Sequence, residues 1–220
     1  MIKLTNITKI YKDSGTKALD GISLEIKERE FVAIMGDSGS GKSTLLNILG
    51  MMDKESDGKY LLDDINVSEM SLKKRESLRK EKIAFVFQQF ALIKRYTIYE
   101  NVELPLIAKG VSSRNRKKMV MEALDSLGIK DIHNKFAMNT SGGQQQRAAI
   151  ARAIVSGSSY IFADEPTGAL DSGNGKEVIE LLKGLHKNGK TIVMVTHNEK
   201  LADEAERIIY IKDGKMSEIK

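Results

Sequence analysis

The sequence predicts an α/β protein built on a mainly parallel sheet with helices on both faces. Short apolar runs typical of buried strands alternate with segments whose apolar residues recur at helical spacing. The apolar run at residues 31–35 leads directly into a glycine-rich loop, and the loop leads into a helical pattern of Leu45, Leu46, Ile48 and Leu49. A strand, a glycine loop and a helix in that order are what a phosphate-binding loop requires.

Composition places the chain among ordinary globular proteins. Its 220 residues are 41% hydrophobic and 30% charged, and it contains no Cys, so disulfides and thiolate metal sites are excluded. The 35 basic and 30 acidic residues give a mild net charge of +5. Basic clusters at residues 73–75 and 114–118 fall where helices are expected and have no interleaved aromatic residues, so we expect no nucleic-acid partner.

No part of the sequence reads as a membrane span. The start lacks the apolar core of a signal peptide, and no apolar run approaches the roughly 18 residues that a spanning helix needs. We therefore expect a protein that is cytosolic or that lies peripherally on a membrane through a partner.

The first half of the chain changes from strands to helices. Strands are expected at residues 4–11, 22–26, 31–35 and 83–87. Residues 97–127 are predicted helical, because Val120, Ala123, Leu124 and Leu127 follow the i, i+3, i+4, i+7 pattern. We expect a mainly helical subdomain at about 88–159, inserted into a single domain whose α/β core comprises residues 1–87 and 160–220.

The alternation of strands and helices resumes after residue 141. A helix through residues 148–154, a strand at 160–163, a helix that ends near 188–189 and a strand at 191–195 follow one another. Residues 207–212 and 215–219 are predicted to form a hairpin, because Asp213-Gly214 suits a two-residue turn with positive φ.

The glycine loop carries the clearest chemical signal. Residues 36–43 match G-x-x-x-x-G-K-[ST] in full, so the backbone can wrap with its N–H groups towards phosphate oxygens. Lys42 is expected to reach the β- and γ-phosphates, and the Ser43 hydroxyl to bind Mg²⁺. The predicted ATP-binding residues of this segment are Gly36, Asp37, Ser38, Gly39, Ser40, Gly41, Lys42, Ser43 and Thr44.

Two acids follow the strand predicted at residues 160–163. Asp164 can lie near the metal, and Glu165 is expected to point elsewhere because side chains alternate along a strand. Glu165 is then a candidate general base that orients or deprotonates the attacking water.

A second candidate phosphate site lies at residues 141–143. Ser-Gly-Gly at a helix start combines a hydroxyl, free N–H groups and the positive end of the helix dipole, although an ordinary N-cap is the alternative interpretation. Two phosphate sites 99 residues apart (141 − 42) suggest one nucleotide clamped between two chains.

Seven motifs in order make the chain similar to the ABC ATPases over nearly its whole length. Residues 36–44 resemble the Walker A motif, 141–144 the signature and 160–165 the Walker B motif. The remaining resemblances are those of residues 168–171 to the D-loop, of His197 to the switch histidine, of Gln88 to the Q-loop glutamine and of Tyr11 to the aromatic residue that stacks on adenine. Gln89 competes with Gln88, Tyr11 can be a plain strand aromatic, and His197 can be a polar cap at a strand end.

The resemblance implies an ATPase that is a head-to-tail homodimer. Its implied catalytic residues are Glu165, His197, Gln88 and Lys42, and its implied Mg²⁺ ligands are Ser43, Gln88 and Asp164. The residues implied to act on the second chain's ATP are Ser141, Gly142, Gly143, Gln144 and Asp171, although Asp171 can alternatively cap the next helix. The family's signature usually begins with Leu, whereas Thr140 precedes Ser141 here. The Ser-Gly-Gly is intact, so phosphate binding is expected to survive, and the departure bears on the packing of the signature helix and on the hydrolysis rate.

Residues 85–93, 99–106 and 164–171 look like the branch that contains MacB, LolD and the bacitracin exporters. That branch implies a cassette at the cytoplasmic face of the membrane that drives a separate permease subunit. Its implied cargoes are antibiotics, peptides or lipoproteins, with antibiotic resistance as one outcome. Residues 88–106 are implied to form the groove for the permease's cytoplasmic helix. The alternative is a non-transport ATPase that signals through a membrane partner in cell division or cell-wall regulation.

Overall fold

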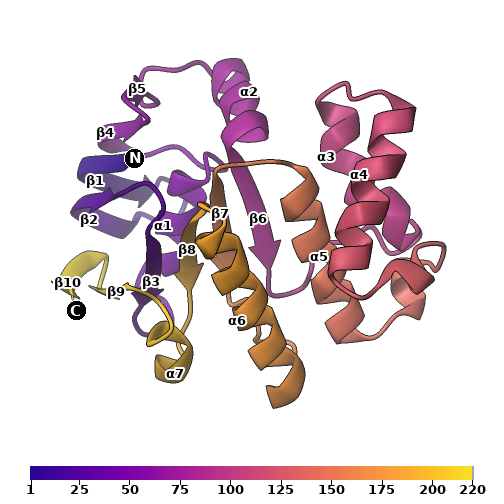
Figure 1. The fold of residues 1–220 in the computed structure, drawn as a ribbon. Coiled ribbons are helices and arrows are strands. Elements are labelled where there is room, and N and C mark those ends of the chain that lie inside the picture. Colours follow the sequence, from indigo (N-terminus) through magenta and orange to yellow (C-terminus); the bar gives the residue numbers. More distant parts are fainter. Residues whose placement is uncertain (220) are drawn as a thin grey trace.

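The computed structural model describes residues 1–219 as two sheets with helices packed against them (Figure 1). Strand order in the smaller sheet is β2-β1-β4-β5, and in the larger sheet it is β10-β9-β3-β8-β7-β6. The predicted α/β class, with an N-terminal antiparallel sheet, a mainly parallel core and a helical part, is confirmed.

The antiparallel sheet consists of β1 (Ile2–Tyr11), β2 (Thr16–Ile26), β4 (Asp57–Leu62) and β5 (Ile65–Asn66). Its first two strands are longer than predicted. The last two strands were not predicted, and they are joined by Asp63 and Asp64 with φ of 49° and 63°. Positive φ at both central residues gives the sharp turn that a two-residue hairpin needs.

The core sheet has five parallel strands and one antiparallel edge strand. The parallel strands are β3 (Phe31–Met35), β6 (Ile83–Phe87), β7 (Tyr160–Asp164), β8 (Thr191–Val195) and β9 (Arg207–Lys212), and β10 (Lys215–Ile219) pairs antiparallel with the last of them. The strands predicted at 31–35, 83–87 and 191–195 and the hairpin around Asp213-Gly214 are confirmed. Continuous apolar runs fit here because helices or the other sheet cover both faces.

Helices form the connections and the helical part. They are α1 (Lys42–Leu49), α2 (Leu72–Lys82), α3 (Ile98–Ala108), α4 (Ser113–Ser126), α5 (Gly142–Val155), α6 (Ser172–Lys187) and the short α7 (Glu199–Ala202), with 3-10 turns at Lys130–Ile132 and Ala137–Asn139. In Figure 1, α3 and α4 stand beyond α5, away from the core sheet. Most of residues 88–159 are helical, while the division at these residues stays a prediction.

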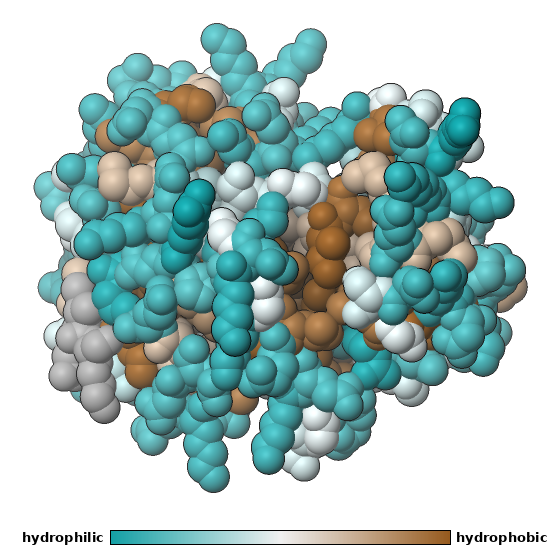
Figure 2. All heavy atoms as spheres, viewed as in Figure 1, coloured by the Kyte–Doolittle hydropathy of each residue, from teal (hydrophilic) through white to brown (hydrophobic). Residues whose placement is uncertain are grey.

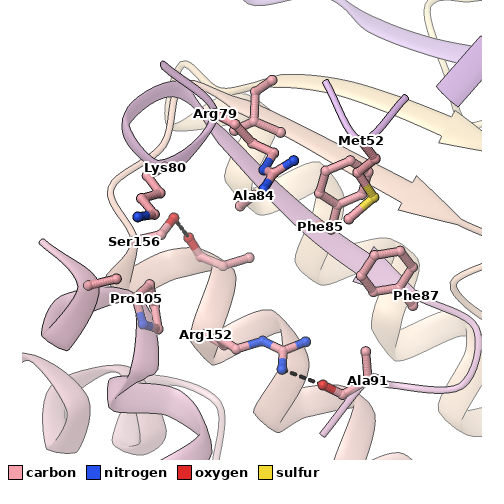
Figure 3. A pocket seen from close by; sticks show the side chains of 13 residues that line it. Met52, Arg79, Lys80, Ala84, Phe85, Phe87, Ala91, Pro105, Arg152 and Ser156 are labelled. Atoms are coloured by element: carbon pink, nitrogen blue, oxygen red, sulfur yellow. Dashed lines mark hydrogen bonds between the residues drawn. The ribbon is translucent and has the colours of Figure 1, made fainter. Parts of the chain in front are cut away.

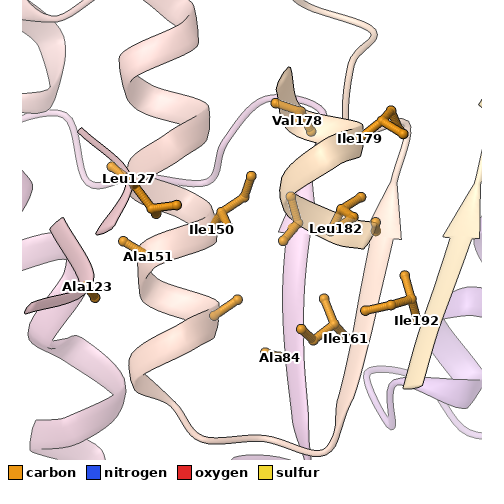
Figure 4. Packing of buried hydrophobic residues seen from close by; sticks show 14 of the residues in the cluster. Ala84, Ala123, Leu127, Ile150, Ala151, Ile161, Val178, Ile179, Leu182 and Ile192 are labelled. Carbon is orange, nitrogen blue, oxygen red and sulfur yellow. The ribbon is translucent and has the colours of Figure 1, made fainter. Parts of the chain in front are cut away.

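Two buried clusters lie on opposite faces of the core sheet because strand side chains alternate. Val32 and Ile34 pack with α1 and the antiparallel sheet. Phe31 and Ala33 belong to the other cluster, which also holds Leu182 of α6. Figure 4 shows this second cluster, where side chains of β7 and β8 meet those of α5 and α6. The core is thus continuous from the sheet into the helical part.

The C-terminal hairpin turn braces the glycine loop. Gly214 N donates to Ser40 O at 2.9 Å, and Gly214 O accepts from Asp20 N at 2.8 Å. The loop between β3 and α1 is therefore held from outside by a segment far along the chain.

Helix α2 is anchored by a buried ion pair as well as by Leu78, which belongs to the core. Arg75 Nη2 lies 2.8 Å from Glu55 Oε1, both side chains are only 3% exposed, and Arg75 Nε donates to Val67 O. Part of the basic cluster at 73–75 is therefore structural.

No helix within residues 1–219 is both long enough and apolar enough to cross a membrane. In Figure 2, polar side chains cover most of the visible face, and apolar side chains gather in a hollow between α6 and α4.

Candidate functional site

The glycine loop before α1 is shaped by close backbone contacts. Gly41 is the N-cap of α1 with φ of 107°, and a Cβ there would lie 2.5 Å from Ala18 O. A Cβ on Gly36 would lie 2.0 Å from Ile211 O. Only glycine fits such positions. Because no side chain caps α1, its first N–H groups remain available for a ligand.

Lys42 folds over this loop. Its Nζ donates to Gly36 O at 2.8 Å and to Asp37 O at 2.6 Å, and the side chain is buried. A hollow of about 390 Å³ lies beside it, lined by residues 16–18, Gly39, residues 41–44 and residues 213–214. The ammonium group and the start of α1 thus face a cavity suited to phosphate groups.

Tyr11, at the end of β1, lies beside the start of α1. Its hydroxyl is 3.4 Å from Thr44 Oγ1 and donates to Asp53 Oδ2 at 3.3 Å, and Lys9 Nζ is 5.0 Å from the centre of its ring. The ring is 38% exposed, so one side is open to a ligand. Neither Asp53 nor Lys9 lies in a sequence motif, so neither could be predicted as a neighbour of Tyr11.

Asp164 ends β7 and is half-buried. Burial raises the pKa of its carboxyl, the neighbouring Glu165 adds to this rise, and the Lys42 ammonium opposes it. The ionised carboxylate is therefore favoured when a further cation is near.

Glu165 lies just past the end of β7 with φ of 46°. The prediction that strand alternation turns its side chain away was wrong in its reason, because the backbone leaves the strand conformation at this residue. Glu165 Oε1 is 2.7 Å from His197 Nδ1. The two residues meet because β7 and β8 are neighbouring parallel strands that end at the same edge.

Ser141 is the N-cap of α5. Its Oγ accepts from Gln144 N at 3.3 Å, and Gln144 Oε1 accepts from Ser141 N at 3.0 Å, which completes a capping box. The N-cap interpretation is confirmed, and the phosphate role stays a prediction. Thr140, where the family usually has Leu, donates to Ala137 O at 2.8 Å, so it closes the preceding 3-10 turn.

Gln88 and Asp171 belong to two loops near α5. A Cβ on Gly168 would lie 2.6 Å from Gln88 Nε2, so the glutamine rests on the loop after β7. Asp171 caps α6 by accepting from Gly173 N and Asn174 N at 3.0 Å, and these hydrogen bonds, that to Asn174 first, lower its pKa. The cap alternative for Asp171 is confirmed, and its contact with a second chain stays a prediction.

Two functional candidates escaped the sequence analysis. Asn174 Oδ1 would lie 2.3 Å from a Cβ on Gly143, so its side chain packs on the start of α5. Gln146 is fully buried, and its Nε2 donates to Pro166 O at 2.6 Å. The sequence pattern could have indicated that Gln146 is buried, because this polar residue falls on the apolar face of α5 with Ala149, Ile150 and Ala153.

A groove of about 560 Å³ lies between the core and the helical part (Figure 3). Its lining includes Met52, Phe85, Phe87 and Pro105. Arg152 of α5 donates to Ala91 O at 2.6 Å and to Phe90 O at 3.0 Å, as the dashed line in Figure 3 shows for Ala91. The groove wall is thus tied to the segment that follows Gln88.

The predicted Mg²⁺ ligands carry suitable oxygen atoms. A hydroxyl (Ser43), a carboxylate (Asp164) and a side-chain amide (Gln88) offer the oxygen ligands that this ion prefers, and the desolvated Asp164 would gain a counter-charge. Within residues 1–219 there is no cluster of three or more His, Cys, Asp or Glu suited to a metal. Any Mg²⁺ here would therefore depend on phosphate oxygens and water as further ligands.

Comparison with known proteins places the chain in a family. The sequence model of the ABC transporter family matches residues 19–168. MJ0796 of Methanocaldococcus jannaschii, an ABC transporter ATP-binding protein, is 48% identical over 223 residues, which cover 98% of this chain and 95% of MJ0796. The macrolide export ATP-binding/permease protein MacB of Hyphomonas neptunium is 44% identical over 98% of this chain, which spans only 34% of MacB.

Solved structures agree with the sequence matches. Dimeric MJ0796 in a post-hydrolysis state bound to ADP and Pi gives a TM-score of 0.93 at 46% identity, covering 100% of this chain and 98% of MJ0796. CbiO1 of Clostridium perfringens, part of the transporter complex cbiONQ, gives 0.89 at 31% identity, covering 99% and 87%. The chain therefore belongs to the ABC transporter family, as an ATP-hydrolysing, ATP-binding subunit of the branch that contains MacB.

Proposed function

We propose that the chain binds Mg-ATP on the loop 36–44, with Tyr11 against the adenine, and hydrolyses it with Glu165 as general base. The observation that best supports this proposal is the 2.7 Å contact between Glu165 Oε1 and His197 Nδ1 at the edge of the core sheet. The histidine orients the carboxylate, which accepts a proton from the attacking water. Lys42 stabilises the charge that develops on the phosphate oxygens.

Ser43, Asp164 and Gln88 are the residues that would hold Mg²⁺. When bound there, the ion supplies neutralising charge to the phosphate oxygens. Gln88 also rests against Gly168, so its position depends on the loop that leads from Glu165 to Asp171. Movement of the segment 88–91 would therefore reach the hydrolysis site directly.

We further propose an ATP-dependent head-to-tail homodimer. Ser141, Gly142, Gly143 and Gln144 present the start of α5 to the ATP of the partner subunit, and Asp171 contacts the partner loop. Support comes from the free N–H groups and positive dipole of a helix start, and from the dimeric form of MJ0796. ATP then favours the closed state because it is contacted from both sides only there.

The output is proposed to be movement of a separate membrane permease. MacB is named as an ATP-binding/permease protein, and this chain spans 34% of the length of MacB. The groove between α2 and α5, lined by Phe85, Phe87 and Pro105, offers an apolar seat for a cytoplasmic helix of the permease. Docking there would place this chain at the cytoplasmic face, in export or detoxification of antibiotics, peptides or lipoprotein-type cargo.

The substitution Glu165→Gln tests the proposal. ATP binding should persist while hydrolysis falls roughly 10²–10⁴-fold, the range for loss of a general base. The variant should dimerise with Mg-ATP by light scattering, and adding Ser141→Arg should keep it monomeric. Full hydrolysis by Glu165→Gln would remove the proposed base, and a monomer under every nucleotide condition, with membrane partner present, would contradict the clamp.

A further inference from the structure

Gln146 is the polar side chain at the centre of α5's buried face. It is 0% exposed, and its carboxamide lies between α5 and Pro166. Because Pro166 O can only accept a hydrogen bond, the contact at 2.6 Å fixes Nε2 towards it. Gln146 Oε1 then points away and has no hydrogen-bond partner within the described residues.

A buried amide with an unpaired oxygen is unfavourable for folding. Ala149, Ile150 and Ala153 occupy the same helix face. An apolar residue of glutamine's length would remove the orphaned Oε1 but would leave the buried Pro166 O without its donor, so these two effects on stability oppose each other. The hydrogen bond to Pro166 is the contact that distinguishes glutamine from such a residue.

The residue held by this bond directly follows Glu165. Glu165 has φ of 46°, a left-handed conformation that is uncommon for a residue with a side chain and needs support from its surroundings. The ring of Pro166 fixes φ of that residue. A hydrogen bond to Pro166 O therefore limits the backbone rotations that remain between this oxygen and Glu165. Val195 O, which accepts from Glu165 N at 2.9 Å, holds the other side.

We propose that Gln146 is a positioning residue that keeps Glu165 in this backbone conformation, so that its carboxylate faces the attacking water. The inference rests on the proposed role of Glu165 as base. Ser141 and Gln146 lie five residues apart on one rigid helix, roughly 7.5 Å along its axis. Binding of the partner subunit's ATP at the helix start is thereby communicated to the base that acts on the chain's own ATP.

The variant Gln146→Met keeps the length of the side chain and removes its hydrogen-bonding groups. We expect kcat to fall about 10- to 100-fold, as for a small displacement of a catalytic group. ATP affinity should be unchanged, and Tm should change little, because the orphaned Oε1 is removed while Pro166 O loses its donor. Gln145→Met is the matched control, since the adjacent Gln145 donates to Thr140 O, away from Pro166, and should hydrolyse ATP near the wild-type rate.

A double-mutant cycle with Glu165→Gln shows whether Gln146 affects hydrolysis through Glu165. If Gln146 acts through Glu165, then Gln146→Met should not lower the residual single-turnover rate of Glu165→Gln further. Wild-type kcat in Gln146→Met, or the same fold loss in both backgrounds, would overturn the inference. A lowered Tm with unchanged kcat would likewise leave only a structural role. Full hydrolysis by Glu165→Gln would instead refute the proposed base, which separates the two failures.

Discussion

The starts of α1 and α5 present phosphate-binding groups in contrasting ways. At α1 the N-cap is Gly41 in a left-handed conformation without a side-chain cap. At α5 the N-cap is Ser141, which forms a capping box with Gln144. The first helix start has no side-chain cap, whereas at the second the Gln144 N–H is already bonded to Ser141 Oγ. A ligand at α5 would therefore rely on the N–H groups of Gly142 and Gly143 and on the Ser141 hydroxyl.

The largest expected effect is on the open helix start. Lys42→Ala removes an ammonium group that only the loop and a phosphate can pair, so monomer ATP affinity should fall by about 2–5 kcal/mol, which is roughly 30- to 5,000-fold. Isothermal titration measures this directly. Ser141→Ala should leave the same affinity unchanged, and a comparable loss in that variant would erase the contrast between the helix starts.

Glycine substitutions sharpen the comparison. Gly41→Ala places a Cβ 2.5 Å from Ala18 O at φ of 107°, so we expect a loss of about 2–4 kcal/mol in unfolding free energy. Gly142→Ala meets only ordinary contacts of 3.5 Å or more, and alanine should stabilise that helix by roughly 0.5–1 kcal/mol. Urea unfolding of both variants is the measurement. If Gly142→Ala also lost ATP-driven dimerisation, the added methyl group would have to clash with the nucleotide bound by the partner subunit, because it meets no close contact within its own chain.

Ser141→Ala should remove the capping box and lower stability by about 1 kcal/mol. Ser112→Ala is the control, because Ser112 is the N-cap of α4 but makes no side-chain cap bond, and its loss should be smaller. Equal losses by chemical denaturation would mean that the hydrogen bond of Ser141 contributes little to α5.

The smallest effect concerns Asp164. Its folded pKa is raised, mainly by burial, so the folded state binds the proton more tightly than the unfolded state. Stability therefore falls as pH rises from the ordinary value of 3.8 through the raised one. Asp164→Asn should raise Tm by a few degrees at most at neutral pH, and this gain should shrink as pH falls. A gain that grew towards acid pH would contradict the assignment.

The sequence predicted the core sheet well and the antiparallel sheet less well. Buried parallel strands such as β3 and β8 are short, fully apolar runs, so their bounds could be recognised. Strand β4 carries Asp57 and Lys59 and pairs with β1, at positions 49 to 60 residues earlier (57 − 8 and 62 − 2). Helix α2 is held by Arg75 and Glu55, a pairing between distant charges that no local pattern announces.

The site shows the same division. Motif spacing predicted roles for Lys42, Glu165 and His197, because such chemistry is tied to fixed loop positions, and the structure brings Glu165 and His197 into contact. It could not show that Glu165 adopts a left-handed backbone, since φ at a strand end is set by neighbouring loops. Nor could it show that Gln146 reaches Pro166, a contact created only when α5 packs beside β7.

The brace between Gly214 and Ser40 has a consequence for biosynthesis. The two residues are 174 positions apart (214 − 40), and Gly214 N donates to Ser40 O at 2.9 Å. During translation the loop leaves the ribosome long before its brace exists, because synthesis proceeds from the N-terminus. The nucleotide loop of a nascent cassette therefore lacks this brace until the C-terminal hairpin has been synthesised.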